Sequence, residues 1–182
     1  MDSLYNRYAS ALFSIAKEKG CIEEYRSEIK LLIDVLKDNV DLEHLFSSWF
    51  IELKEKEDII DKVFNDFKED IRNFIKVIVA NKRGNELHKI LEEYVKISNA
   101  ELGIEEGIVY STEKLTKAQI DKIEKKLSEV TKVKVELVNR IDERLIGGIK
   151  VVLNDSVYDG SLRNKIESLR KTLLKGDRLL WH

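Results

Sequence analysis

Residues 141–163 read IDERLIGGIKVVLNDSVYDGSLR, and this stretch contains signals for a strand, a turn and a helix. The apolar run at 149–153 follows two glycines and predicts a strand. Asp155 and Ser156 predict the turn that follows it. Ser161 is a suitable N-cap for a final helix. The C-terminal part of the chain is therefore expected to mix strands with helices.

The residues upstream of this stretch continue the same mixture. Val133, Val135 and Leu137 alternate with charged residues, which is the period of a half-buried strand. Residues 107–111 form another short run of β-forming residues, and Thr116 is placed to cap a helix between these two strands. Together the patterns predict a small α/β unit with a short sheet and two helices over residues 105–182.

The first 104 residues contain few helix-breaking residues, because Pro is absent from the chain and Gly is sparse before Gly103. Apolar residues recur there at spacings of three and four, as on the buried face of a helix. Such patterns occur at residues 4–16, 22–36, 42–46, 59–67, 74–79 and 87–97. We therefore expect an α+β fold, mostly α, in which a six-helix bundle over residues 1–104 precedes the α/β unit.

The composition excludes several classes of protein. Hydrophobic residues make up 43% of the 182 residues, which is enough for a buried core and argues against global disorder. A single cysteine excludes an internal disulfide framework and a zinc site built from several cysteines. No apolar run approaches the length of about 20 residues that a membrane-spanning helix needs. We therefore expect a soluble chain without a secretory signal.

The charge is nearly balanced overall but is divided between the two parts. The net charge of −2 does not indicate binding to a bulk polyanion. Residues 1–104 carry 16 basic and 21 acidic groups, whereas residues 105–182 carry 16 basic and 13 acidic groups. Two units of opposite sign are consistent with two different partner surfaces, and equally with helix faces that are simply solvated.

Motifs for catalysis or cofactor binding are missing from the sequence. It contains no G-x-x-x-x-G-K-[ST], no G-x-G-x-x-G and no H-E-x-x-H. Gly147-Gly148 precedes a strand rather than a helix, so it does not have the usual context of a phosphate-binding loop. A bulge, or close packing of this backbone against another segment, explains the two glycines better. We expect no catalytic residue, no cofactor and no metal site.

Three pieces of the sequence resemble one known family. Residues 8–16, YASALFSIA, resemble the opening Y-A-x-A-L-F-x-x-A of the ATP synthase delta subunit family, which includes the mitochondrial oligomycin-sensitivity-conferring protein. Residues 81–83, NKR, resemble the N-x-R that closes the family's fifth helix. Residues 141–163 resemble its D-x-x-L-I-G-G-x-x-V block and the following D-G-S-[LV]-R. These pieces have the family's order and spacing, although Arg144 stands where a smaller residue is common.

The resemblance implies a non-catalytic stator component of the rotary, proton-translocating ATP synthase. The bundle of residues 1–104 would then bind the N-terminal helices of alpha subunits, and residues 105–182 would bind the b-type peripheral stalk. This linkage would stop the catalytic head from turning with the rotor. The chain would lie on the cytoplasmic side of the bacterial inner membrane and contact it only through the complex.

The candidate binding residues follow from the resemblance and from a physical requirement. A docked helix needs two neighbouring helices with apolar residues that their own core leaves uncovered. The expected lining of the groove for the alpha helix is Tyr8, Ala11, Phe74 and Val77, with Asn81 at its end. On the stalk side we expect Gly147, Gly148, Asp159 and Ser161 as scaffold, and Leu162, Ile166 and Leu169 either packing the last helix down or receiving the stalk. Packing within the chain's own cores explains the same residues without a partner.

Two other functions remain open at this stage. A generic adaptor that binds some other amphipathic helix would share every physical feature except the rotary complex. A nucleic-acid-binding module would use the basic helix after Ser161, whose residues Arg163, Lys165, Arg170 and Lys171 have no aromatic residues between them for base stacking. Such a module would show a steep salt dependence of binding. We expect no nucleic acid partner.

Overall fold

The computed structural model describes the backbone of residues 4–176 and the side chains of residues 4–171. The chain divides into two compact units, and the boundary between them lies between Leu102 and Gly103 in the sequence. The first strand begins at Ile104, so this residue already belongs to the second unit. The fold is α+β and mostly α, as the sequence patterns predicted.

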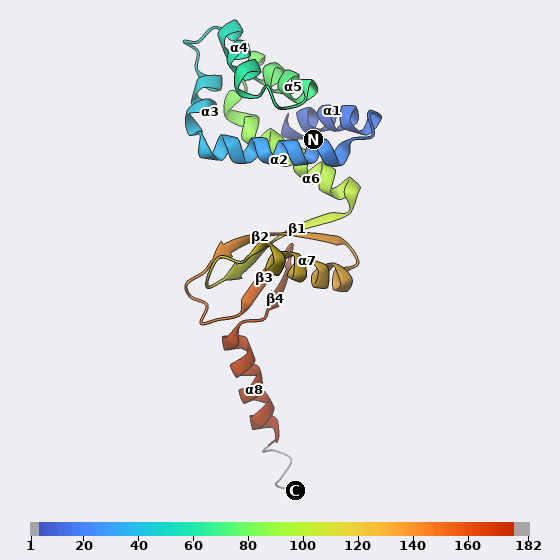
Figure 1. Cartoon of the computed structure of the whole chain (residues 1–182), viewed down its shortest axis with the longest axis vertical. Helices are drawn as coiled ribbons and strands as arrows, with labels where there is room; N and C mark the ends of the chain where they lie inside the picture. Colours follow the sequence, from blue (N-terminus) through green and yellow to red (C-terminus); the bar gives the residue numbers. More distant parts are fainter. Residues whose placement is uncertain (1–3, 177–182) are drawn as a thin grey trace. The chain divides into compact units, whose positions relative to one another are not determined.

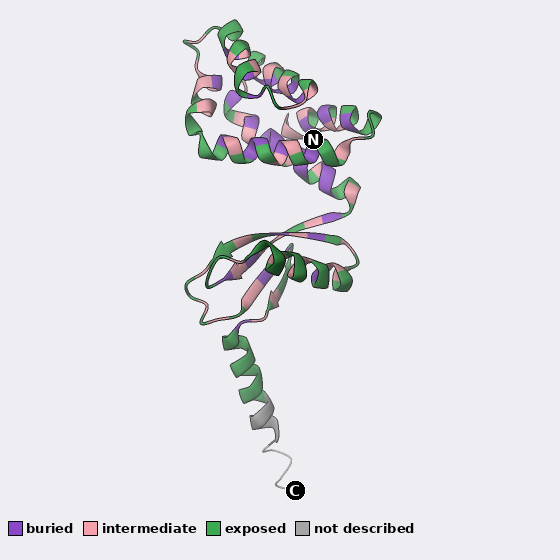
Figure 2. Ribbon diagram, in the orientation of Figure 1, coloured by how far each residue is buried: buried purple, intermediate pink, exposed green. Residues whose placement is uncertain are grey.

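The first unit consists of helices (Figure 1). Its α-helices are α1 (Leu4–Glu18), α2 (Ile22–Asp38), α3 (Val40–Ser47), α4 (Leu53–Val63), α5 (Glu69–Ala80) and α6 (Leu87–Leu102), and the 3-10 helix η1 (Gly84–Glu86) precedes α6. Both α1 and α2 pack along α6, and α4 packs against α5. The prediction of six α-helices in this part is confirmed, and their buried faces enclose one hydrophobic core (Figure 2).

The spacing of apolar residues explains which helix faces are buried. In α1 the buried residues Ala9, Leu12 and Ala16 are three and four positions apart, so they lie on one side of the helix. Gly20 ends the first helix with a φ of +67°, a conformation that glycine adopts without a steric cost. The connection to α2 is therefore short and fixed by its sequence.

The fourth helix differs from the prediction at both ends. The apolar pattern at residues 59–67 predicted a helix there, but α4 begins at Leu53 and ends at Val63. Phe64 and Phe67 lie in the turns that follow, where Phe64 is buried and their rings meet edge to face at a centroid distance of 5.6 Å. The apolar spacing continues beyond the helix because these turns pack into the same core.

The second unit is a four-stranded sheet with two helices (Figure 1). Its elements are β1 (Ile104–Ser111), α7 (Lys117–Thr131), β2 (Lys134–Ile141), β3 (Ile149–Leu153), β4 (Ser156–Asp159) and α8 (Leu162–Gly176). The strand order is β2-β1-β3-β4, with β1 and β2 parallel and the other neighbours antiparallel. Strand β4 was missed because the turn at Asp155 was expected to lead directly to the last helix.

Local chemistry fixes the start of α7 and the small core of this unit. The Thr116 hydroxyl accepts a hydrogen bond from the Gln119 backbone, and the Gln119 side chain accepts one from the Thr116 N–H, which is a capping box. This confirms Thr116 as the N-cap. Helix α7 packs against β2, where Leu127 joins Val109 and Val135 in a separate hydrophobic core.

Candidate functional site

Helices α1 and α5 form an open groove in the helical unit. The groove has a volume of about 490 Å³. Its lining residues come from both helices: Arg7, Tyr8, Ala11, Leu12, Ile15, Asp70, Asn73, Phe74 and Val77. Lys19, after the end of α1, pairs with Asp70 near the start of α5, and the Arg83 guanidinium lies 5.5 Å from the Tyr8 ring at the other end. The two helices therefore run in opposite directions along the groove.

Most of the groove wall is apolar. Leu12 and Phe74 are buried beneath it and belong to the core. Val77 is 50% exposed and Ile15 is 39% exposed, although neither side chain has a polar group to interact with water. Ala11 is exposed beside them and leaves space between the walls. An exposed apolar surface of this kind is typical of a site that binds an apolar partner.

The exposed wall arises because each helix has more apolar residues than its core-facing stripe needs. In α5 the buried residues include Phe74, Ile75 and Ile78, and Val77 lies beside this face rather than on it. In α1, Ala11 and Ile15 are four residues apart and therefore form a second stripe next to the buried one. The sequence thus gives both helices a wide apolar face, of which only part is covered.

Four of the five residues predicted for the groove are brought together there: Tyr8, Ala11, Phe74 and Val77. Asn81 does not line it, because its side-chain N–H donates to the Val77 carbonyl at 2.7 Å and caps the end of α5. Sequence reasoning missed the polar lining residues Arg7, Asp70 and Asn73. The spacing of four between Arg7 and Ala11 could have identified the first of these, whereas Asp70 and Asn73 needed the packing of α5 against α1.

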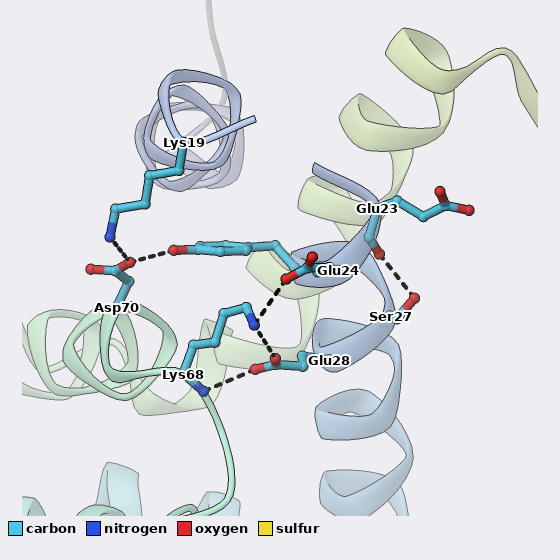
Figure 3. A network of polar contacts seen from close by, with 8 residues as sticks. Lys19, Glu23, Glu24, Ser27, Glu28, Lys68 and Asp70 are labelled. Carbon is cyan, nitrogen blue, oxygen red and sulfur yellow. Dashed lines mark hydrogen bonds and ion pairs between the residues drawn. The ribbon is translucent and has the colours of Figure 1, made fainter. Parts of the chain in front are cut away.

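A polar network holds the end of the groove at which α5 begins (Figure 3). One Asp70 oxygen accepts hydrogen bonds from both Lys19 and the Tyr25 hydroxyl. The hydrogen bond from Lys19, followed by that from Tyr25, lowers the pKa of Asp70 below its ordinary value of 3.8. Burial, together with the hydrogen bond to Asp70, raises the pKa of Tyr25. The network links α1, α2 and α5, so it fixes the width of the groove at this end.

A second cluster anchors the residue before α5 (Figure 3). The Lys68 ammonium lies 3.1 Å from carboxylate oxygens of both Glu24 and Glu28, and the Lys68 backbone N–H donates to Glu28 at 2.9 Å. The hydrogen bonds that the Lys68 ammonium donates, first to Glu24 and then to Glu28, raise the pKa of Lys68. The start of α5 is thus tied to α2 by a backbone and a side-chain contact.

In the second unit, the predicted scaffold residues form the junction between β3, β4 and α8. Gly148 has a φ of +81°, and a Cβ there would lie 2.5 Å from the Gly160 carbonyl oxygen. A Cβ on Gly147 would lie 2.7 Å from a methyl group of Leu162. At residue 148 only glycine fits beside the Gly160 backbone, whereas a side chain at residue 147 would have to displace Leu162. The pair therefore shapes the backbone that leads into β3.

The N-terminus of α8 is capped by side chains. The Asn164 N–H donates to the Ser161 hydroxyl at 3.2 Å, which confirms Ser161 as the N-cap. The Asp159 carboxylate accepts from the Ser161 N–H at 2.9 Å, and hydrogen bonds from the Ser161 side chain and backbone lower the pKa of Asp159. These contacts give α8 a defined starting point.

The described part of α8 leaves its apolar side uncovered (Figure 2). Ile166 is 63% exposed and Leu169 is 64% exposed, and Leu162 is also exposed. These residues are spaced by four and three positions, so they form one stripe. Leu162 lies partly against Gly147, whereas most of the Ile166 and Leu169 side chains remains uncovered.

Two kinds of site are absent from the described residues. Within residues 4–176, no group of three or more His, Cys, Asp or Glu side chains could hold a metal ion. Over the same range, no helix combines the length and the apolar character needed to cross a membrane.

Comparison with known proteins identifies the family. The family described as ATP synthase delta (OSCP) subunit matches residues 4–173. The chain belongs to this family. ATP synthase subunit delta of Mycoplasma capricolum is 42% identical over 177 residues, covering 94% of this chain and 97% of the relative. The subunit of the same name from Bacillus thuringiensis is 35% identical over 170 residues, covering 93% and 94%.

A solved structure has the same fold. One chain of the Toxoplasma gondii mitochondrial ATP synthase hexamer superposes with a TM-score of 0.67 at 21% identity, covering 95% of this chain and 98% of that one. The resemblance found in the sequence is confirmed by the family match. As a member of the delta (OSCP) family, the chain is a non-catalytic subunit of ATP synthase and serves as a stator linker.

Proposed function

We propose that the groove between α1 and α5 binds the N-terminal helix of an ATP synthase alpha subunit. Helix α8, whose N-terminus is capped by Ser161, would bind the b-type peripheral stalk. The helical unit, expected over residues 1–104, would hold the catalytic head. The α/β unit, expected over residues 105–182, would hold the stalk. The observation that supports this most strongly is the groove of about 490 Å³, whose exposed walls are apolar on both facing helices.

The chemistry of the groove suits an amphipathic helix. The side chains of Ile15 and Val77 offer an apolar surface on opposite walls, and the small Ala11 allows the guest backbone to approach closely. Arg7 and Asp70 provide polar contacts at the rim. A guest helix with one apolar face would bury this surface and keep its polar face in water.

The stator role also sets the strength that the joint needs. A joint under continuous torque depends on slow dissociation more than on fast capture. A nanomolar dissociation constant corresponds to about −12 kcal/mol. An interface of roughly 1,600 Å² can supply this free energy when a few central side chains are well buried. Two docking surfaces on separate units fit a linker that must hold two partners at once.

For the stalk, the exposed stripe of Leu162, Ile166 and Leu169 has the spacing by which one helix packs against another. Basic residues flank this stripe on α8: Arg163, Lys165, Arg170 and Lys171. A stalk helix with acidic residues beside its apolar face would therefore complement α8. The residues Gly147, Gly148, Asp159 and Ser161 support this surface by fixing the start of the helix.

Filling the groove tests the alpha-subunit assignment. Ala11→Trp places a large side chain between the walls, so a synthetic alpha N-terminal helix should bind the full chain at least about tenfold more weakly. Ala118→Trp, at an exposed position of α7, adds the same side chain outside the groove and should leave the affinity unchanged. Equal affinity of the Ala11→Trp variant and the native chain would remove the groove from the proposal.

A pull-down tests the whole assembly. The proposed role places the chain at the cytoplasmic side of the bacterial inner membrane, in contact with it only through other subunits. Pull-down of the chain from detergent-solubilised membranes should therefore recover both alpha and b subunits. Recovery of neither subunit would contradict the proposed partners and would favour a generic helical adaptor.

A further inference from the structure

Strand β2 forms one edge of the sheet in the α/β unit. It has β1 on one side and, among residues 4–176, no strand on the other. The opposite edge strand, β4, has four residues, whereas β2 has eight. The backbone groups on the outer side of an edge strand can pair with a strand of another chain, and a longer strand offers more of them. The outer side of β2 is therefore where the sheet is most open to strand addition.

Alternate residues of β2 direct their backbone groups to this outer side. The Lys134 N–H donates to the Gly103 carbonyl at 3.2 Å, so Lys134 pairs toward β1. In a strand that pairs in parallel, both backbone groups of one residue point to the same side, and this side alternates along the strand. The N–H groups of Val135 and Leu137 therefore point away from β1.

Two side chains of α7 occupy the place of a neighbouring strand. The Val135 N–H donates to the Ser128 hydroxyl at 2.9 Å. The Leu137 N–H donates to the Glu124 carboxylate at 2.7 Å. Ser128 and Glu124 are both half-buried, as expected for side chains that lie between the helix and the strand. The two donors that an incoming strand would use are thus already bonded, one of them to a charged acceptor.

The repeat of the helix matches the repeat of the strand. Glu124 and Ser128 are four residues apart, which corresponds to about 6 Å along the axis of α7. Val135 and Leu137 are two residues apart, which corresponds to about 6.6 Å along β2. One face of α7 can therefore present an acceptor to each of two successive outward N–H groups.

The series of acceptors ends at Ile120, the next residue on this face of α7. Ile120 has no side-chain acceptor, and with Asn139 and Ile141 it lines an open pocket of about 640 Å³. Two apolar side chains of β2 are also exposed, Val138 by 59% and Ile141 by 58%. Without its seal, β2 would therefore offer a second chain both backbone groups and apolar surface.

We infer that Glu124 and Ser128 seal the edge of β2 against a strand from a second copy of this chain. An incoming β2 would have to displace both side chains before its carbonyl groups could accept from Val135 and Leu137. The displaced Glu124 carboxylate would lose its hydrogen bond and lie beside the carbonyl oxygens of the new strand, which is unfavourable. The seal keeps the unassembled chain from pairing with itself. This inference goes beyond the proposed function, because it involves neither the catalytic head nor the stalk.

Hydrogen exchange of the full chain tests the seal directly. In the native chain, the amide protons of Val135 and Leu137 should be protected although they lie at an edge. Glu124→Ala/Ser128→Ala removes both acceptors and should speed exchange of the two amides at least about tenfold. Glu124→Gln retains a side-chain oxygen, so Leu137 should stay protected in this variant.

Sedimentation velocity over a series of concentrations tests the consequence. Glu124→Ala/Ser128→Ala should associate more strongly than the native chain while its circular dichroism stays native-like. Addition of Val138→Lys should reverse this association, because Val138 lies near the middle of β2 and pairing of two strands would bring like charges together.

A matched control is available on the same helix. Lys125→Ala/Glu129→Ala changes two exposed residues of α7 with the same spacing of four. This variant should behave like the native chain both in hydrogen exchange and in sedimentation.

Three results would overturn the inference. The first needs no variant: unprotected amides of Val135 and Leu137 in the native chain would show that the edge is not sealed. The second is a folded Glu124→Ala/Ser128→Ala variant that associates no more than the native chain. The third is association that Val138→Lys does not reduce, because it would not involve pairing of β2. None of these results would affect the groove between α1 and α5 or the assignment of α8.

Discussion

Replacing Ile15 and Val77 by alanine removes two apolar side chains from opposite walls of the groove between α1 and α5. Because Val77 is half exposed and Ile15 somewhat less so, a docked helix would bury the remaining area of each. Complete burial of such a side chain contributes about 1.5–3 kcal/mol, so the exposed part of each contributes about 1 kcal/mol. The double variant should therefore lose about 2 kcal/mol of binding free energy, or about thirtyfold in the dissociation constant.

The assay is isothermal titration of the full chain with a synthetic alpha N-terminal helix. Leu31→Ala is a matched control, because Leu31 is 60% exposed on α2 and does not line the groove. This variant should bind the helix with unchanged affinity. Thermal unfolding of all variants would confirm that the fold is retained. A loss smaller than about threefold in the folded double variant would refute the groove as the binding surface.

Three further outcomes are expected. Because the pKa of Asp70 is lowered, its ionised carboxylate stabilises the fold at pH values above the ordinary pKa of 3.8, and this stabilisation is lost as the pH falls through the lowered pKa. Asp70→Asn should therefore have a smaller free energy of unfolding at pH 7, and its stability should depend less on pH in the acid range. Gly148→Ala should lower the free energy of unfolding, measured by denaturant titration, by about 2–3 kcal/mol. Gly20→Ala should lower it by only about 1 kcal/mol, because a Cβ at this position would meet no atom within 4 Å. Leu169→Asp should change the free energy of unfolding by less than about 0.5 kcal/mol, because Leu169 is exposed, but should weaken b-subunit binding at least about tenfold in a pull-down titration. A clear loss of stability of the α/β unit would contradict the exposed position of Leu169.

The periodic pattern predicted much of the fold because helices and strands bury their residues at different intervals. The three- and four-residue spacing in α1 and the alternation in β2 both correspond to observed elements. Strand β4 was missed because it has only four residues and owes its conformation to pairing with β3. Phe64 and Phe67 were assigned to a helix because their core contacts continue the helical spacing through a turn.

The candidate groove was only partly accessible from the sequence. Tyr8, Ala11 and Val77 could be selected because they add apolar surface to helices that already have a buried stripe, whereas Phe74 belongs to the buried stripe itself. Asn81 was placed beside them by resemblance, and its position after α5 gave no information about the direction of its side chain. That side chain hydrogen-bonds to its own helix, a local contact that only coordinates reveal.

The sequence by itself determined the family, the helical first part, the mixed second part and the absence of catalytic motifs, because these depend on residue types and on spacing along the chain. Only the tertiary structure decided which apolar residues stay exposed: Val77 in the groove, Leu169 on α8 and Trp49 in its loop. Exposure depends on how much of a side chain its neighbours cover. Those neighbours come from distant parts of the chain, so periodicity within one helix cannot specify them.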